Sequence, residues 1–243
     1  MAIADRRPIK ARSLPITEKS AKWLSQYVSA NQVSIASVIC SVIAVFFMIG
    51  GPGIVGATFA VLFLIGRLVC NLLDGMIAVE NGKKTFDGIL YNEIPDRISD
   101  MITFIALGML GGTGADLILG ALVSGVAVTT AAIRYLGSSL GQPMDFSGYG
   151  QKSYRIIGTA GITFISGIMT TIGSDALVPS FVGLGLLVLL GMSIQTCYVR
   201  LINIRARMKQ AEIAEKKKNT SGTRVPVADT GELNMSEFEF EGD

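Results

Sequence analysis

Residues 67–100 read RLVCNLLDGMIAVENGKKTFDGILYNEIPDRISD, and this stretch decides the fold. It lies in a chain of 243 residues that is 50% hydrophobic and only 16% charged, whereas soluble domains carry about 25% charged residues. Charged side chains inside apolar blocks are costly in a membrane and are usually functional. We therefore expect an all-α integral membrane protein with its chemistry in this stretch.

Six apolar blocks are long enough to cross a bilayer, which takes about 20 helical residues. They are 33–50, 54–79, 90–112, 115–136, 153–173 and 177–203. The connections at 50–53, 111–114 and 172–175 carry no Lys or Arg, whereas the N-terminal segment, the alternate connections and the segment after 200 hold nearly all of them. By the positive-inside rule, both termini are expected in the cytoplasm.

The flanking segments divide the chain into three expected parts. Residues 1–32 form a cytoplasmic N-terminus whose segment 17–28 suits a short interfacial amphipathic helix, with an extension of the first span as the alternative. Residues 33–205 form the six-helix transmembrane domain. Residues 206–243 are polar and without an apolar period, which indicates a disordered cytoplasmic tail.

The available chemistry is restricted by what the sequence lacks. It contains no histidine, which excludes an imidazole metal ligand or an imidazole general base. Cys40, Cys70 and Cys197 lie in apolar blocks without a short pair spacing, so we expect small buried residues instead of a disulfide framework or a zinc site. Acid–base or metal chemistry must therefore use carboxylates, amides or hydroxyls.

Two stripes of polar and small residues follow helical spacing. At about 100° per residue, the first stripe is Arg67, Asn71, Asp74 and Ala78, with Gly75 beside it. The second has four-residue spacing and is Gly88, Asn92, Asp96 and Asp100, with Glu93 and Arg97 beside it. Two antiparallel helices would bring the stripes face to face, and oxygen ligands suit a hard cation such as Mg²⁺ or Mn²⁺.

A simpler interpretation of the stripes is a set of intramembrane salt bridges, for example Arg67 with Asp74, and Arg97 with Asp96 or Asp100. A second basic cluster lies between the fourth and fifth blocks and consists of Arg134, Lys152 and Arg155. Cations near a metal site are suited to a pyrophosphate or a phosphomonoester. The alternative for each of these three is ordinary positive-inside flanking charge.

The run NLLDGMIAVENGKKTFDGILYNEIPD, residues 71–96, resembles the signature of the CDP-alcohol phosphotransferases, membrane enzymes of phospholipid synthesis. That signature reads D-x2-D-G-x2-A-R-x8-G-x3-D-x3-D, and the spacing matches without a gap. The segment SANQVSI, residues 29–35, is similar to the PNxxT motif that opens the first span in this family. The six-span layout and the interfacial helix extend the resemblance over most of the chain.

The resemblance implies that an acceptor hydroxyl attacks the β-phosphorus of a CDP-activated lipid or alcohol and releases CMP, with two divalent ions bound. Asp96 would be the catalytic general base. The metal-ligand positions would be Asn71, Asp74, Asn92 and Asp96, with Glu93 and Asp100 as spare carboxylates. The CDP pocket would be formed by Gly75, Ala78 and Gly88, with Arg67 for the phosphates, and Arg134, Lys152 and Arg155 would bind the acceptor or its phosphate.

Three positions depart from the signature: Asn71 and Asn92 replace aspartates, and Val79 replaces the arginine. An amide oxygen can ligate a hard cation but contributes no charge. The variant looks like a bacterial side branch of the family. Its departures leave a non-catalytic CDP-lipid-binding protein as an alternative to an enzyme.

The resulting hypothesis is a phosphatidyltransferase that moves a phosphatidyl group from CDP-diacylglycerol to a small hydroxylated acceptor, with glycerol-3-phosphate as one candidate. The alternative within the same chemistry uses a soluble CDP-alcohol and diacylglycerol. A transporter is less favoured, because the polar residues concentrate at the cytoplasmic ends of two adjacent spans. The expected partners are these substrates, membrane lipids and a second copy of the chain as a homodimer candidate, without nucleic acid, in the inner membrane of a bacterium.

Overall fold

The structure is a computed structural model that describes residues 14–79 and 88–220, and over these ranges it is entirely helical. Some residues used in the topology prediction lie outside the described residues. They are the basic residues before position 14, Lys83 and Lys84 in the connection between the second and third blocks, and the part of the expected tail from 221 onward.

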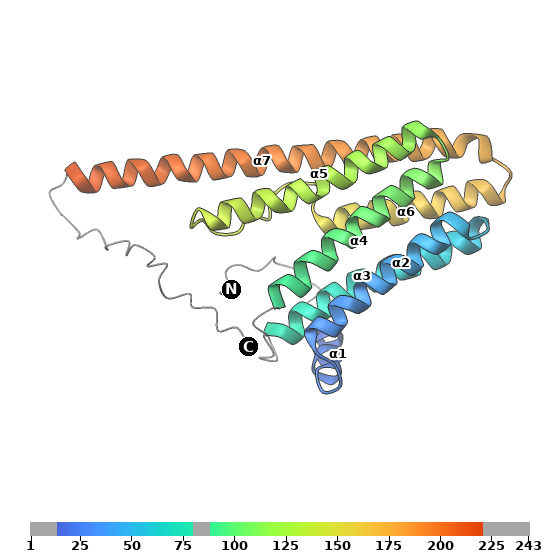
Figure 1. Cartoon of the computed structure of the whole chain (residues 1–243), viewed down its shortest axis with the longest axis horizontal. Coiled ribbons are helices and arrows are strands. Elements are labelled where there is room, and N and C mark those ends of the chain that lie inside the picture. The colour runs from blue at the N-terminus through green and yellow to red at the C-terminus, as the bar shows by residue number, and fades with distance from the viewer. Residues whose placement is uncertain (1–13, 80–87, 221–243) are drawn as a thin grey trace, which may run out of the picture. The chain divides into compact units, whose positions relative to one another are not determined.

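The helices follow the apolar blocks of the sequence (Figure 1). They are α1 (Pro15–Leu24), α2 (Ala30–Gly50), α3 (Gly53–Val79), α4 (Gly88–Gly111), α5 (Gly114–Ser139), α6 (Lys152–Thr171), the short 3₁₀ helix η3 (Asp175–Leu177) and α7 (Val178–Thr220). Each of the six expected spans is a long helix, which confirms the all-α class.

Four helices within the described residues are long and apolar enough to cross a membrane by length and composition. They are Ala30–Gly50, Gly53–Ala78, Gly114–Ser139 and the continuous stretch Asp175–Lys217. The other two long helices, α4 and α6, contain most of the charged residues singled out above, which lowers their mean hydropathy. These two helices carry Glu93, Asp96, Asp100, Lys152 and Arg155, and α3 and α5 supply the remaining charged candidate site residues.

Each of these two helices lies against apolar neighbours. α4 contacts α2 and α5, and α6 contacts α3. The shared core draws on six helices, α2 to α7, through buried side chains, among them Leu64, Phe104, Val123, Ile156 and Leu186. Small residues permit close approach: a Cβ added to Gly120 of α5 would lie 2.5 Å from the Phe104 carbonyl oxygen of α4. This packing holds the charged residues of α4 and α6 inside the bundle.

The N-terminal helix α1 matches the expected interfacial helix but begins earlier and ends earlier than 17–28. Pro15 occupies its first turn, where a missing N–H leaves no hydrogen bond unmade. Trp23 and Tyr27 are exposed, with ring centroids 5.2 Å apart, whereas Leu24 packs against buried residues that include Ile77 of α3. An apolar anchor and exposed aromatic rings fit a helix that lies in a membrane interface.

The C-terminal helix α7 is longer than expected. The polar tail was predicted from residue 206, but α7 continues to Thr220. Residues 205–217 are rich in Ala, Lys, Arg, Glu, Gln and Met, which are strong helix formers, and Lys216 pairs with Glu212 one turn away at 2.5 Å. The chain divides into two compact units, Met1–Ile204 and Arg205–Asp243, within this helix.

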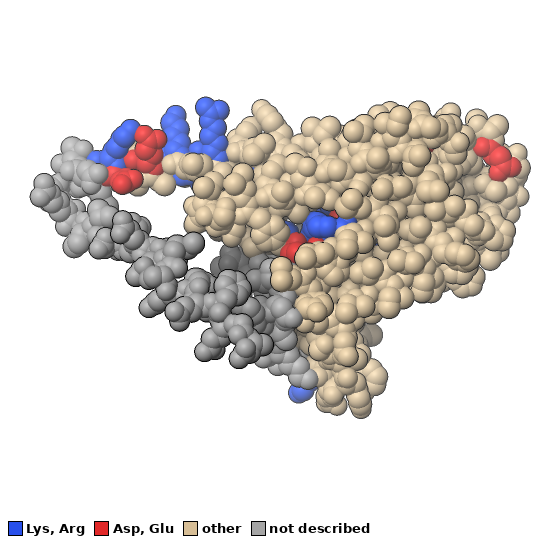
Figure 2. Space-filling model, in the orientation of Figure 1, with Lys and Arg blue, Asp and Glu red and all other residues tan. Residues whose placement is uncertain are grey.

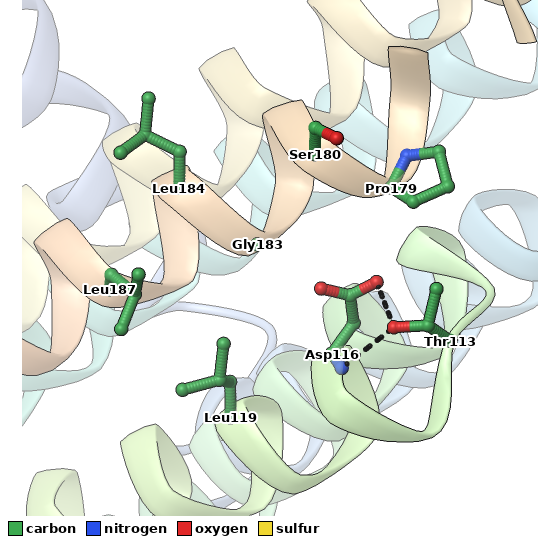
Figure 3. A pocket seen from close by; sticks show the side chains of 8 residues that line it. All are labelled: Thr113, Asp116, Leu119, Pro179, Ser180, Gly183, Leu184 and Leu187. Atoms are coloured by element: carbon green, nitrogen blue, oxygen red, sulfur yellow. Dashed lines mark hydrogen bonds between the residues drawn. The ribbon is translucent and has the colours of Figure 1, made fainter. Parts of the chain in front are cut away.

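At the end of the bundle opposite the charged stripes, an open pocket lies between the first turns of α5 and α7 (Figure 3). Asp116 is buried there, and its carboxylate accepts a hydrogen bond from Thr113 Oγ1 at 2.6 Å. Thr113 Oγ1 in turn accepts from the Asp116 backbone N–H at 3.1 Å. The Asp116 carboxylate is therefore part of the N-terminal cap of α5, where negative charge is stabilising.

The cysteines differ from expectation in one respect. Cys40, Cys70 and Cys197 are free thiols, as expected, but each is half-buried instead of fully buried. Their helices each present one side to the exterior of the bundle, where large apolar side chains such as Ile39, Val69 and Tyr198 are exposed.

Candidate active site

Four helices bring their charged residues together at one end of the bundle. In Figure 2 basic and acidic atoms are visible together in one hollow of a face of the bundle that is mostly uncharged. The contributing side chains come from the second half of α3, the first half of α4, the end of α5 and the start of α6. They form three ion-pair clusters and one isolated carboxylate.

The deepest cluster joins Arg67, Asp100 and Arg155, from α3, α4 and α6. Arg67 is in contact with Asp100 Oδ1, and an Arg155 terminal nitrogen lies 3.2 Å from Asp100 Oδ2. The three side chains are at most 2% exposed. Buried charges are tolerated only when they are paired and hydrogen-bonded. Asp100 therefore holds both arginines in place and ties three helices together.

The two arginines make further bonds that complete this cluster. Arg67 donates to the Asp96 carbonyl oxygen at 3.4 Å. Arg155 donates to the Gly150 carbonyl oxygen at 2.5 Å and to Thr130 Oγ1 at 3.3 Å. Because both guanidinium groups also contact backbone carbonyls, their positions depend on α4 and on the loop before α6.

The second cluster is the pair of Asp96 and Lys152. The Lys152 ammonium nitrogen lies 2.5 Å from Asp96 Oδ1. Both side chains are largely buried, at 11% exposed for Lys152 and 9% for Asp96. The expected general base is therefore in direct contact with the first residue of α6.

The third cluster surrounds Glu93 at the wider end of the site. Arg97, one turn along α4, lies 2.8 Å from Glu93, and Arg134 of α5 lies 3.3 Å from both of its carboxylate oxygens. Arg134 is also held 3.2 Å from the Tyr135 hydroxyl, and its guanidinium carbon lies 5.4 Å from the Phe146 ring centroid. Arg134 is thus fixed by charge and by cation–π contact.

Asp74 of α3 is different from the other three carboxylates. Ser34 of α2 donates a 2.7 Å hydrogen bond to Asp74 Oδ2, and both residues are buried. In the part of the chain that the structure describes, Asp74 has no ion pair with a Lys or Arg. Asp96 lies close enough for its charge to act on the Asp74 carboxyl group. The two carboxylates of the signature are therefore neighbours, one paired with a cation and one with a hydroxyl.

The remaining signature residues lie nearer the mouth of the site. Asn71 Nδ2 donates to the Arg67 carbonyl oxygen at 2.9 Å, so its amide oxygen is the atom available to a ligand. Asn92 is exposed, whereas Asp96 and Asp100 on the same stripe are buried. Gly75 and Ala78 lie on α3, and Gly88 opens α4. The α4 stripe thus runs from the surface into the bundle.

The salt-bridge interpretation named different partners from those observed. Arg67 pairs with Asp100 and not with Asp74, and Arg97 pairs with Glu93 and not with Asp96 or Asp100. The predicted bridges do not form because Asp100, on the facing helix, is the carboxylate at the depth of Arg67. The pairing leaves Asp74 without a cation partner among the described residues.

Sequence reasoning missed the contribution of α7 and of the loop between α5 and α6. Arg200 donates to the Ser147 carbonyl oxygen at 3.2 Å and Asn203 donates to Asp145 Oδ2 at 2.8 Å. The Gly150 N–H donates to Thr196 Oγ1 at 2.7 Å. These bonds fix the loop that delivers Lys152 and Arg155. A polar stripe within the last apolar block could have indicated this contribution of α7, because Thr196, Arg200 and Asn203 share a helix face.

The oxygen atoms of the site decide whether a metal ion can bind there. Among residues 14–79 and 88–220, no three Asp, Glu, Cys or His side chains are grouped to hold a metal ion. The Asp74 carboxylate, the Asn71 amide oxygen and the neighbouring Asp96 are nevertheless hard oxygen donors of the kind that Mg²⁺ and Mn²⁺ prefer. Asp74 and Asn71 therefore fit a hard divalent ion, whereas Glu93, Asp96 and Asp100 are each in contact with a side-chain cation.

The fold and the site define this chain as a helical membrane protein with the fold of the CDP-alcohol phosphotransferases, the family that its signature resembles. Crystal structures of Mycobacterium tuberculosis phosphatidylinositol phosphate synthase, PgsA1, share this fold. The complex with CDP-DAG has a TM-score of 0.60 at 22% identity and covers 79% of this chain and 94% of PgsA1. The complex with manganese and citrate has a TM-score of 0.59 at 22% identity and covers 77% and 88%.

A curated relative is the inner membrane protein YnbA of Escherichia coli (strain K12). It is 26% identical over 137 residues, which are 56% of this chain and 67% of YnbA. No family model matches the chain. The comparisons thus support a membrane protein with the PgsA1 fold, and the sequence identity to PgsA1 is too low to transfer its activity directly.

Proposed function

We propose that the chain is a phosphatidyltransferase that transfers the phosphatidyl group of CDP-diacylglycerol to a small hydroxylated acceptor and releases CMP. One observation carries this proposal: Asp96 of α4 lies close enough to Asp74 of α3 for its charge to act on that carboxyl group, and both residues occupy positions of the CDP-alcohol phosphotransferase signature. The CDP-DAG complex of PgsA1, which has the same fold, supports it.

In the proposed reaction, the acceptor hydroxyl oxygen forms a bond to the phosphorus next to diacylglycerol. The bond from that phosphorus to the oxygen of CMP breaks, and CMP leaves with the electron pair. Asp96 accepts the proton of the acceptor hydroxyl as general base. Its place on α4, buried yet one turn below the exposed Asn92, suits a group that meets a substrate entering from the surface.

The neighbouring residues receive separate roles. Gly75, Ala78 and Gly88 are assigned to the cytidine and phosphate groups, because small side chains let a ligand approach the backbone. Arg67 and Arg155, anchored on Asp100, supply fixed positive charge below the reacting phosphorus. Preorganised charge of this kind stabilises negative charge that develops in a transition state.

A divalent ion bound by Asp74 and Asn71 would neutralise the pyrophosphate and stabilise the departing CMP. The manganese complex of PgsA1 supports such an ion. Ser34 contributes by orienting Asp74 through its 2.7 Å hydrogen bond.

The location of the site suits a lipid donor. Large apolar side chains are exposed along α2, α3 and α4, for example Phe46, Leu62 and Ile98, so diacyl tails can remain in lipid while the head group reaches the hollow. We place this end of the bundle and both termini in the cytoplasm, because the basic residues concentrate there. Arg134, near the mouth and only partly neutralised by Glu93 at 3.3 Å, is the best placed cation for an acceptor phosphate.

The proposal is tested by CMP release from purified protein in detergent, given CDP-diacylglycerol, Mg²⁺ or Mn²⁺, and acceptors with and without a phosphate. We expect CMP with one acceptor class and a loss of at least about 100-fold in Asp96→Asn, with Lys209→Met, an exposed residue of α7, as the unchanged control. Full activity in Asp96→Asn would refute its assignment as base.

A non-catalytic CDP-lipid-binding protein is the second candidate. It is favoured by Asn71 and Asn92 in place of aspartates and by the Lys152 ammonium on Asp96. Retained binding of CDP-diacylglycerol with no CMP formed from any acceptor, or from a soluble CDP-alcohol with diacylglycerol, would establish this candidate instead of the enzyme.

A further inference from the structure

The charge balance of the site is unusual for a metal centre. The described cluster contains four carboxylates: Asp74, Glu93, Asp96 and Asp100. It contains five cations: Arg67, Arg97, Arg134, Lys152 and Arg155. The side chains thus carry one excess positive charge before any metal binds. Two divalent ions would add four more positive charges in a buried place, where repulsion is poorly screened.

Lys152 is the cation that contacts Asp96, one of the residues expected to bind metal. Its ammonium lies 2.5 Å from Asp96 Oδ1, at a signature carboxylate. Its backbone is fixed, because the Gly150 N–H bonds to Thr196 of α7 and the Gly150 carbonyl accepts from Arg155. Arg67 and Asp100, which are paired with each other, also act on this ammonium. The charge of Lys152 acts in addition on the carboxyl groups of Asp74 and Glu93. Lys152 is therefore held on Asp96 by the fold.

We infer that the Lys152 ammonium takes the place of one divalent cation, so that the site binds a single divalent ion, beside Asp74. The two asparagines are consistent with this arrangement: Asn71 and Asn92 remove two negative charges where a built-in ammonium supplies one positive charge. Asp74 is left as the signature carboxylate without an ion pair among the described residues, with a hydroxyl partner in Ser34.

The inference deepens the proposed function and rests on it for the meaning of the ion, but it concerns metal binding and can be measured without turnover. An ammonium differs from a divalent ion in that it cannot be removed by a chelator. The site therefore keeps one of its two positive centres permanently and requires only the other from solution.

The experiment is a titration of the purified chain with Mn²⁺ alone, in which bound ion is counted by electron paramagnetic resonance. We expect one Mn²⁺ per wild-type chain and loss of that ion in Asp74→Asn. In Lys152→Met we expect either a second bound ion or about tenfold or tighter binding, because a repelling charge is removed. Lys152→Arg should keep the wild-type stoichiometry, since it keeps the charge.

Lys209→Met serves as the matched control, because Lys209 is exposed and is expected to bind Mn²⁺ like the wild type. A thermal unfolding midpoint measured without Mn²⁺ verifies that each variant is folded, and Lys152→Arg keeps the test valid if Lys152→Met unfolds. Two ions on the wild type, no ion on the wild type, or equal binding by wild type and Lys152→Met would overturn the inference. CMP release decides the proposed function separately.

Discussion

Replacing Asp100 by asparagine should destabilise the bundle more than any other isosteric change at the site. The substitution preserves shape but removes the charge that faces Arg67 and Arg155, both of which are almost completely buried. Breaking a buried ion pair by removing one partner costs about 3–5 kcal/mol. The introduced amide can still accept one hydrogen bond, and Arg155 retains the Gly150 carbonyl oxygen and Thr130. We therefore expect the free energy of unfolding to fall by about 3 kcal/mol, the lower end of this range.

The assay is reversible unfolding by SDS in mixed micelles, with helix content as the readout. Asp175→Asn, at the start of η3 and away from the site, is the control and should change the free energy of unfolding by less than about 0.5 kcal/mol. Combining Asp100→Asn with Arg155→Gln should be less destabilising than the sum of the two changes, because the residues share one network. An Asp100→Asn variant within about 1 kcal/mol of the wild type would refute the assignment of Asp100 as the anchor of both arginines.

Two further changes test how the site is positioned. Ser34→Ala should destabilise the fold by about 1–3 kcal/mol, because the buried Asp74 carboxylate loses its 2.7 Å hydrogen bond. The same change should raise the Mn²⁺ concentration needed for half-maximal binding. An unchanged titration curve would show that Ser34 does not orient Asp74. Gly150→Ala should lower both stability and CMP release, because the new Cβ would lie 2.5 Å from the Met192 carbonyl oxygen. Gly125→Ala, where nothing lies within 4 Å of the added Cβ, is its matched control in unfolding and activity assays, and equal effects of the two changes would contradict this account of the loop.

Much of the fold follows from the sequence because the membrane restricts the choices. A span must satisfy its own backbone hydrogen bonds, so each long apolar block becomes a helix. The stripe of Asn71 and Asp74 and the stripe of Asn92 and Asp96 could be located from helical spacing alone. The pair of Arg67 on α3 and Asp100 on α4 shows that the two helices bring charged residues of the stripes together.

The pairing within the site could not be predicted in this way. Asp74 is the carboxylate of the stripes nearest to Arg67 in the sequence and shares its helix face, yet Arg67 pairs with Asp100, which depends on the relative depth of α3 and α4. Periodicity determines the face of a helix but not its translation along a neighbour. Lys152 on Asp96 and Arg200 on the loop before α6 likewise depend on contacts between segments about 50 residues apart.

The end of α7 shows a different limit. The polar composition after residue 205 was interpreted as a tail, yet the same residues, rich in Ala, Glu and Lys, favour a helix when an existing helix leads into them. Nucleation is the costly step of helix formation, and the apolar part of α7 has already supplied it.

The proposed transfer of a phosphatidyl group can be measured by following the phosphorus next to diacylglycerol. CDP-diacylglycerol carrying a radioactive label at this phosphorus is incubated with the purified chain, Mn²⁺ and an acceptor panel, and lipid products are separated from CMP. We expect label in a new phospholipid, in an amount equal to the CMP released, and its disappearance in Asp96→Asn. Label that stays in CDP-diacylglycerol with every acceptor, although the protein is folded and binds Mn²⁺, would contradict the proposed transfer.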